Sequence, residues 1–122
     1  MRLRSLLVLG LSAVVLAGCS FQNKYEKEAD KLTRAVIANN MQPVQDDFTP
    51  AVAHQITRVK VAELSDELAD QGTYQGLKEN TQGCTPVGYH CFDVKFEKRP
   101  YREWLQMDDT GKVSGWRIHS AT

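Results

Sequence analysis

Residues 90–107 read HCFDVKFEKRPYREWLQM, and in them large apolar side chains alternate with polar ones. A period of two is typical of a β-strand with one buried face. Arg99 and Pro100 predict a turn, so the stretch indicates two antiparallel strands, 90–97 and 101–107. The inward positions of the first strand are His90, Phe92, Val94 and Phe96. The inward positions of the second strand are Tyr101, Glu103, Leu105 and Met107.

The sheet extends in both directions from this pair. Residues 108–111, DDTG, predict a hairpin connection, because glycine accepts a positive φ. Residues 113–119 then form a further strand, with Trp116 and Ile118 on its inner side. Residues 73–80 give a weaker signal for a fourth strand at the other end of the sheet.

The part of the chain before the sheet has helical periodicity. From residue 24 to about 40, Tyr25, Ala29, Leu32 and Val36 recur at helical spacing. Residues 44–48 suit one short helical turn. Thr49 and Pro50 then predict a capped start for a helix from residue 50 to about 56. A further helix is expected over residues 57–71, with a break near Thr57 and with Gly72 as its C′ residue.

The N-terminus carries the signature of export. Arg2 and Arg4 precede an apolar stretch, residues 6–15, that is too short to span a bilayer permanently. The following residues 16–19, LAGC, resemble the lipobox of bacterial lipoproteins. This resemblance implies cleavage before Cys19 and lipidation of its sulfur; the alternative is an uncleaved or non-lipidated signal. Ser20, in place of an aspartate, implies sorting to the outer membrane, facing the periplasm.

The chain therefore divides into a signal peptide, residues 1–18, a lipidated cysteine with a short tether, 19–23, and one α+β domain, 24–122. Cys84 and Cys91 are the remaining thiols, and an oxidising compartment favours their pairing. The loop-entropy model assigns such a bridge about 2.5 kcal/mol. A redox pair and a metal site are the competing interpretations, but Cys-x-x-Cys spacing and further ligands are both missing.

Helices followed by a curved antiparallel sheet resemble the nuclear transport factor 2-like superfamily, a cone-shaped α+β roll. Gly72-Thr73-Tyr74 after the last helix and the turn 108–115, DDTGKVSG, carry the resemblance. It implies an apolar cavity between helices and sheet as the default binding site. The alternative is that the same large side chains simply fill the core. The candidate cavity residues are Tyr74, Phe92, Phe96, Tyr101, Leu105 and Trp116.

Catalytic members of that superfamily, such as ketosteroid isomerase, place a carboxylate in the cavity. Glu103 is the one acidic residue in phase with an apolar strand face, so it is a weak catalytic candidate. His54, His90 and His119 lack metal-ligand spacing, and no nucleophile elbow, phosphate loop or dinucleotide fingerprint is present. No metal and no cofactor are expected.

Arg102 and Trp104 should lie on the outer face of the sheet, where tryptophan and arginine are typical of interfaces. They predict a homodimer or a partner protein of the envelope, unless helices or the 84–91 loop cover Trp104. The chain holds 15 basic and 15 acidic residues, and loses Arg2 and Arg4 with the signal. Without a basic cluster, nucleic acid is excluded as a partner. The sequence favours a membrane-anchored binding or accessory module, with a cavity-carboxylate enzyme as the alternative.

Overall fold

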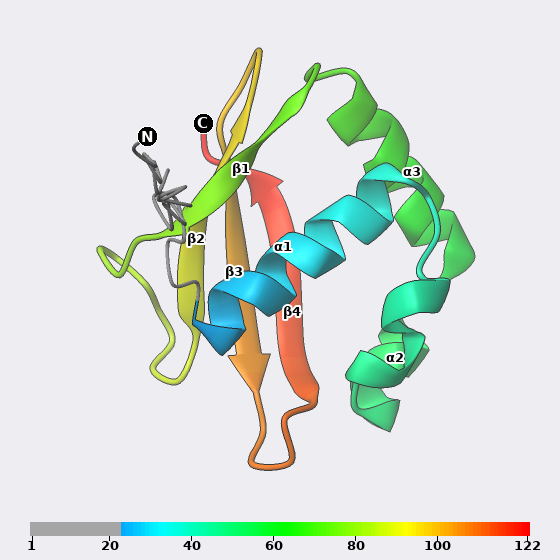
Figure 1. Ribbon diagram of the computed structural model, residues 1–122, viewed down its shortest axis with the longest axis vertical. Coiled ribbons are helices and arrows are strands. Elements are labelled where there is room, and N and C mark those ends of the chain that lie inside the picture. The colour runs from blue at the N-terminus through cyan, green and yellow to red at the C-terminus, as the bar shows by residue number, and fades with distance from the viewer. Residues whose placement is uncertain (1–22) are drawn as a thin grey trace, which may run out of the picture.

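A computed structural model describes residues 23–122, in which helices cover one face of a four-stranded antiparallel sheet (Figure 1). The predicted signal peptide, Cys19 and the tether up to residue 22 lie outside the described residues. Within 23–122, no helix combines the length and apolar character needed to cross a bilayer. The elements are α1 (Lys24–Ile37), the 3₁₀ turn η1 (Gln42–Asp47), α2 (Pro50–Gln55), α3 (Arg58–Ala69), β1 (Tyr74–Glu79), β2 (His90–Phe96), β3 (Tyr101–Met107) and β4 (Val113–Ser120).

The sheet follows chain order, β1-β2-β3-β4, so the predicted α+β class is confirmed. Phe92 of β2 pairs with Glu103 of β3, and Glu103 pairs with Ile118 of β4. All three side chains are buried, as the sequence predicts for strands 90–97, 101–107 and 113–119. The weak strand at residues 73–80 is present as β1, with an irregular register near Gly76, whose φ is 99°. A glycine meets this backbone requirement without strain.

The helix boundaries follow from their caps. Asn23 accepts a hydrogen bond from the backbone N–H of Glu26 and starts α1. The helix ends at Ile37, about three residues before the predicted end, because Asn39 takes a left-handed conformation with φ 50°. Its N–H and that of Asn40 bond back into the last turn, which closes the helix in a Schellman arrangement.

Threonine hydroxyls cap the starts of the next two helices, as predicted for Thr49. Thr49 accepts from the N–H of Val52 at the start of α2, and Thr57 accepts from the N–H of Lys60 at the start of α3. The expected break near Thr57 is therefore confirmed. Gly72, with φ 84°, lies two residues beyond the capping residue of α3 rather than one. The predicted turn at 44–48 is present as η1, shifted slightly toward the N-terminus.

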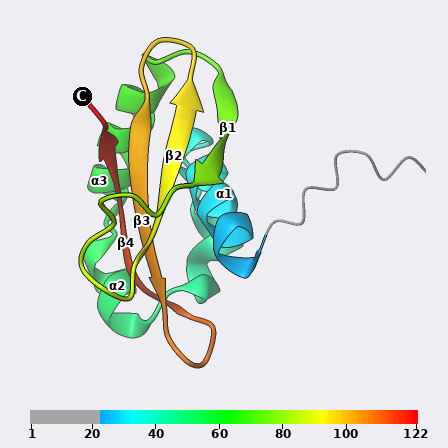
Figure 2. The same ribbon diagram turned by 90° about the vertical axis from the view of Figure 1, so that its left-hand side faces the viewer.

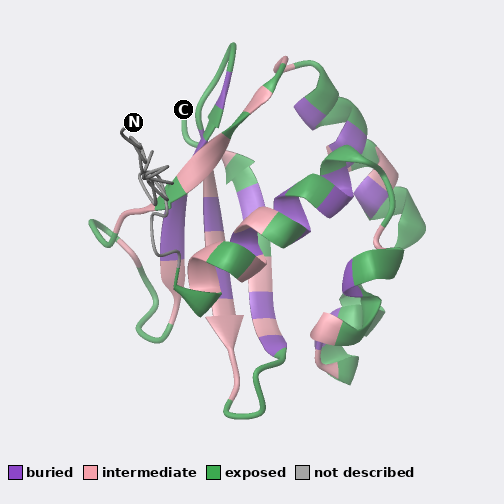
Figure 3. Ribbon diagram, viewed as in Figure 1, coloured by how far each residue is buried: buried purple, intermediate pink, exposed green. Residues whose placement is uncertain are grey.

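The core lies between α1 and the inner face of the sheet (Figure 3). Ala29, Leu32 and Val36 of α1 are fully buried there, so the helical periodicity of the sequence describes the packed face. Two apolar clusters form this core, one toward η1 and α2 and the other toward α3. Met41, Leu77 and Trp116 contact both clusters and make the core continuous.

Candidate functional site

Glu103 is the ionisable side chain that the fold buries completely. It projects from the middle of β3 toward α1, and its exposed fraction is 0%. Its Oε2 accepts a hydrogen bond from Nε1 of Trp116 at 2.7 Å. Its Oε1 lies 2.7 Å from Oγ1 of Thr33 on α1. Both carboxyl oxygens therefore have a partner inside the protein, as a buried polar group requires.

The hydroxyl of Thr33 lies within hydrogen-bond distance of two acceptors. Oγ1 of Thr33 also lies 2.9 Å from the carbonyl oxygen of Ala29. A hydroxyl group has one hydrogen to donate. Thr33 is therefore the donor in both contacts, and its single hydrogen is shared between the Glu103 carboxyl and the Ala29 carbonyl.

The surroundings of Glu103 favour its neutral form. Burial raises the pKa of Glu103 to about 8, and the negative charge of Asp30 adds to that rise. The hydrogen bonds with Trp116 and Thr33 lower the pKa by less than burial raises it. At pH 7 the buried side chain is uncharged.

A second polar group lies beside this acid, nearer the surface. The hydroxyl of Tyr74 donates to Oδ1 of Asp30 at 2.6 Å, and Nε of Arg34 donates to Oδ2 at 2.9 Å. The Arg34 guanidinium also lies 5.1 Å from the centre of the Tyr74 ring. Burial and the adjacent Asp30 raise the pKa of Tyr74 above its usual range. Asp30 is thus shared between a phenol and a cation.

The six predicted cavity residues belong to the core. Four are buried and two are half-buried and packed against the apolar clusters. None of them lines the large cleft described below, which corresponds to the alternative that they fill the core. The buried four are Phe92, Phe96, Tyr101 and Leu105, and the half-buried two are Tyr74 and Trp116.

The large cleft lies between the end of α1, η1, α2 and the start of α3, and its volume is ≈ 850 Å³. Sequence reasoning missed this site, because it depends on how four separate segments are placed. Its exposed polar side chains form a rim, and its buried or half-buried apolar side chains form a floor. The floor consists of Met41, Phe48, Ile56 and Val61. The rim includes Asn39, Asn40, Gln42, Gln45, Thr57 and Arg58.

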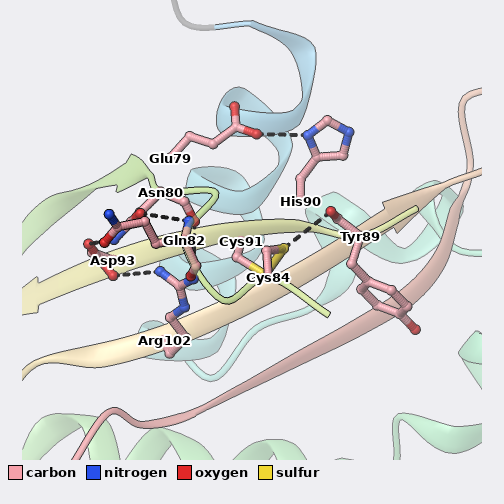
Figure 4. The surroundings of a disulfide bond; sticks show 9 residues. All are labelled: Glu79, Asn80, Gln82, Cys84, Tyr89, His90, Cys91, Asp93 and Arg102. Carbon is pink, nitrogen blue, oxygen red and sulfur yellow. Dashed lines mark hydrogen bonds and ion pairs between the residues drawn. A yellow bond between two sulfur atoms is a disulfide. The ribbon is translucent and has the colours of Figure 1, made fainter. Parts of the chain in front are cut away.

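The opposite face of the sheet is partly covered by the loop of residues 80–89 (Figure 2). Arg102, predicted to lie on this face, holds the loop in place (Figure 4). Its Nη2 donates to the carbonyl oxygens of Asn80 at 3.0 Å and Gln82 at 2.7 Å. Its Nη1 donates to Asp93 at 2.8 Å. The guanidinium is thus occupied by the protein itself.

Trp104 lies on the same outer face and is half-buried. The Arg117 guanidinium lies 4.4 Å from the centre of a Trp104 ring, and the His119 ring lies at 4.5 Å. Among the described residues, its buried indole nitrogen has no hydrogen-bond partner. The two predicted interface residues are therefore adjacent, but one is committed to the loop and the other is partly covered.

The disulfide joins this loop to β2, as predicted (Figure 4). Cys84 and Cys91 have Cα atoms 5.7 Å apart, and Cys91 is fully buried opposite Trp104. At the far end of the loop, Tyr89 packs over Gly115 of β4. A Cβ on Gly115 would lie 2.9 Å from the Tyr89 Cζ and closer still to its hydroxyl oxygen.

The three histidines are separated in the fold. His90 pairs with Glu79 at 2.8 Å through Nδ1 and stacks on Tyr25 at 3.6 Å between ring centres, whereas His54 and His119 are exposed. Over residues 23–122, no group of three or more His, Cys, Asp or Glu side chains is arranged to hold a metal ion.

Comparison of the chain with protein-family models, curated proteins and solved structures found no match.

Proposed function

We propose that this chain is a lipid-anchored protein of the bacterial cell envelope, attached through Cys19 to the outer membrane and facing the periplasm, whose α+β domain binds a ligand without catalysing a reaction. The lipobox-like LAGC at residues 16–19 supports the anchor. The disulfide between Cys84 and Cys91 supports an oxidising compartment. The order of helices and sheet supports a place in the nuclear transport factor 2-like superfamily.

The binding function is supported by the fact that the buried acid, Glu103, does not line the cleft. Glu103 is sealed between α1 and the sheet, and neither it nor Thr33 nor Trp116 lines the cleft. The cleft has the size and the mixed apolar and polar lining of a small-molecule site. Its lining contains no carboxylate, histidine or cysteine. A site of this composition can bind and orient a molecule, but lacks groups for acid-base or nucleophilic chemistry.

The described chain begins at the first residue before α1, and the cleft lies at the other end of this helix. This helix has 14 residues, which corresponds to about 21 Å. The tether between Cys19 and Asn23 extends at most about 14 Å. A domain anchored this way stays close to the bilayer.

Two experiments test the proposal. Mass spectrometry of the native protein should find acyl chains on residue 19, and Cys19→Ser should release the protein from the membrane fraction. Unmodified Cys19 in a soluble native protein would contradict the anchor.

The cleft is tested by filling it. Ala53 and Ala51 are both exposed on α2, but only Ala53 lines the cleft. Ala53→Phe should abolish the binding of small molecules that co-purify with the native protein, whereas Ala51→Phe should leave it unchanged. Equal behaviour of the two variants would contradict the cleft as the binding site.

A catalytic function is the second candidate, and the neutral acid at Glu103 favours it, because strongly perturbed acids concentrate at functional sites. Such an enzyme would use Glu103 to move a proton on a small enolisable ketone that enters between α1 and the sheet. Deuterium incorporation from D₂O into such ketones, lost in Glu103→Gln, would establish it. For a binding domain, the wild-type and Gln proteins should both show only the background rate.

The exposed part of Trp104 supports an interface on the outer face, either with a second copy or with an envelope protein. Trp104→Ala should then convert a dimer to a monomer in light scattering of the lipid-free domain. A monomer before and after the substitution refutes the dimer.

A further inference from the structure

The charge in the lining of the cleft is positive, with no negative side chain beside it among the described lining residues. Of the described residues that line the cleft, Arg58 is the only ionisable one, and it stands on the wall formed by the first turn of α3. No carboxylate pairs with Arg58 among residues 23–122. The cleft therefore offers a ligand one uncompensated positive charge.

The remaining lining divides into an apolar and a neutral polar part. Phe48 and Val61 are 7% exposed and give the floor an apolar surface that water contacts poorly. The amide side chains of the rim, such as Gln42 and Gln45, both donate and accept hydrogen bonds but carry no charge. The apolar part of a ligand fits the floor. The uncharged amides of the rim can bind a polar group of the ligand whether that group is positive, negative or neutral.

We infer that the cleft binds a small amphiphile with a single anionic head, of the type of a medium-chain fatty acid, with its chain on Phe48 and Val61 and its carboxylate at Arg58. This inference rests on the proposed binding function and adds the chemical class of the ligand. The cleft volume of ≈ 850 Å³ lies in the usual range for ligands of this size. An anionic head is favoured over a neutral or cationic one because only Arg58 supplies charge.

The test compares three probes of equal chain length: decanoate, decanol and decyltrimethylammonium, each below its micelle concentration. Calorimetry on the full-length lipidated protein in detergent should rank decanoate first. An exposed arginine–carboxylate pair accounts for a preference of about fivefold over decanol. The cation should bind more weakly than the alcohol.

Arg58→Gln should remove the preference, so that decanoate and decanol bind alike. Lys60→Gln, an exposed cation on the same helix that does not line the cleft, is the matched control and should keep it. Arg58→Glu should reverse the ranking in favour of the cation.

The outcomes separate the two proposals. Equal binding of decanoate and decanol to the unmodified protein overturns the anionic ligand class and leaves the cleft as an apolar binding site. Binding of all three probes that Ala53→Phe does not weaken, or no binding of any probe, overturns the assignment of the ligand to this cleft. A decanoate preference that survives Arg58→Gln also overturns the inference, because the charge then resides elsewhere.

Discussion

Arg102 and Glu103 are neighbours on β3, yet their side chains leave opposite faces of the sheet and meet opposite surroundings. Glu103 is fully buried against α1, finds no cation, and is neutral at pH 7. The side chain of Arg102 is 13% exposed, and a carboxylate and two carbonyl oxygens accept its hydrogens. One ionisable group is accommodated by losing its charge and the other by saturating its hydrogen bonds.

The difference shows what each face of the sheet provides. The inner face is covered by α1, whose packed side offers Glu103 only the hydroxyl of Thr33. The outer face is partly covered by the 80–89 loop. The backbone carbonyl oxygens of Asn80 and Gln82 in this loop accept their hydrogen bonds from Arg102. Each face has its own tryptophan, so changes on the two faces can be followed separately. Trp116 contacts Glu103 on the inner face, and Trp104 lies opposite Cys91 on the outer face.

The largest effect is expected from Glu103→Gln, which keeps the shape of a neutral acid and removes its titration. The pKa of Glu103 is raised from 4.5 to about 8 in the folded protein. Between these values the unfolded chain ionises while the folded one stays neutral, so this group makes stability fall as pH rises. At about 1.4 kcal/mol per pH unit, the wild type should lose about 4 kcal/mol relative to Glu103→Gln between pH 4 and pH 8.

Denaturant unfolding at pH 4, 6 and 8 measures this difference. Glu63→Gln, on an exposed position of α3, is the control and should follow the wild type. In NMR spectra the indole N–H signal of Trp116 should shift and that of Trp104 should not. Parallel pH profiles for the wild type and Glu103→Gln would show that the acid is not held neutral.

Removal of the disulfide is expected to act on the outer face. The double substitution Cys84→Ser, Cys91→Ser frees the short loop in the unfolded chain, and the entropy model predicts a loss of about 2.5 kcal/mol. Here the Trp104 signal should shift while that of Trp116 stays in place. A reductant should reproduce the loss in the wild type and have no effect on the double variant. A shift of both tryptophans would mean that the faces are coupled through β3.

Gly115→Ala tests the packing of the loop on β4. The new Cβ would overlap the ring of Tyr89, and such overpacking costs about 1–3 kcal/mol. Removing the ring with Tyr89→Ala should restore most of the loss, so the two substitutions should be strongly non-additive in denaturant unfolding. Additive effects would show that Tyr89 does not lie on Gly115 in solution.

The sequence predicts what depends on neighbours in the chain. The period of two over residues 90–107 placed Glu103 on the buried face, and the hydroxyl of Thr49 before Pro50 located the start of α2. The end of α1 was misplaced, because Asn39 takes a left-handed conformation that periodicity does not reveal.

The sequence does not predict what depends on distant segments. Thr33, which forms a hydrogen bond with Glu103, is 70 residues away in the chain. The polar side chain of Thr33 lies between the apolar Leu32 and Val36, which indicates a buried hydrogen bond. The sequence does not identify the residue that forms this bond. Likewise, a glycine within a strand, such as Gly115, indicates that another group packs closely against the backbone. The sequence does not show that this group is Tyr89.

The smallest effect is expected from Arg102→Lys, which keeps the charge and removes the planar fork. The Asp93 side chain is 58% exposed, so its ion pair contributes little, and lysine can retain it. A single ammonium cannot also reach the carbonyls of Asn80 and Gln82 in the same geometry. The expected loss is therefore about 1 kcal/mol, the scale of the hydrogen bonds to the loop.

Hydrogen exchange tells where that loss falls. Amides in the 80–89 loop should exchange faster in Arg102→Lys, and the Trp104 indole N–H should become accessible, while the Trp116 N–H stays protected. Arg99→Lys, at an exposed position next to β3, is the control and should change neither signal. If Arg102→Lys leaves the loop protected, the disulfide alone holds the outer face closed, and Arg102 is free to contact a partner. If the loop opens, the arginine is what keeps Trp104 covered, and a partner on this face must first displace the loop.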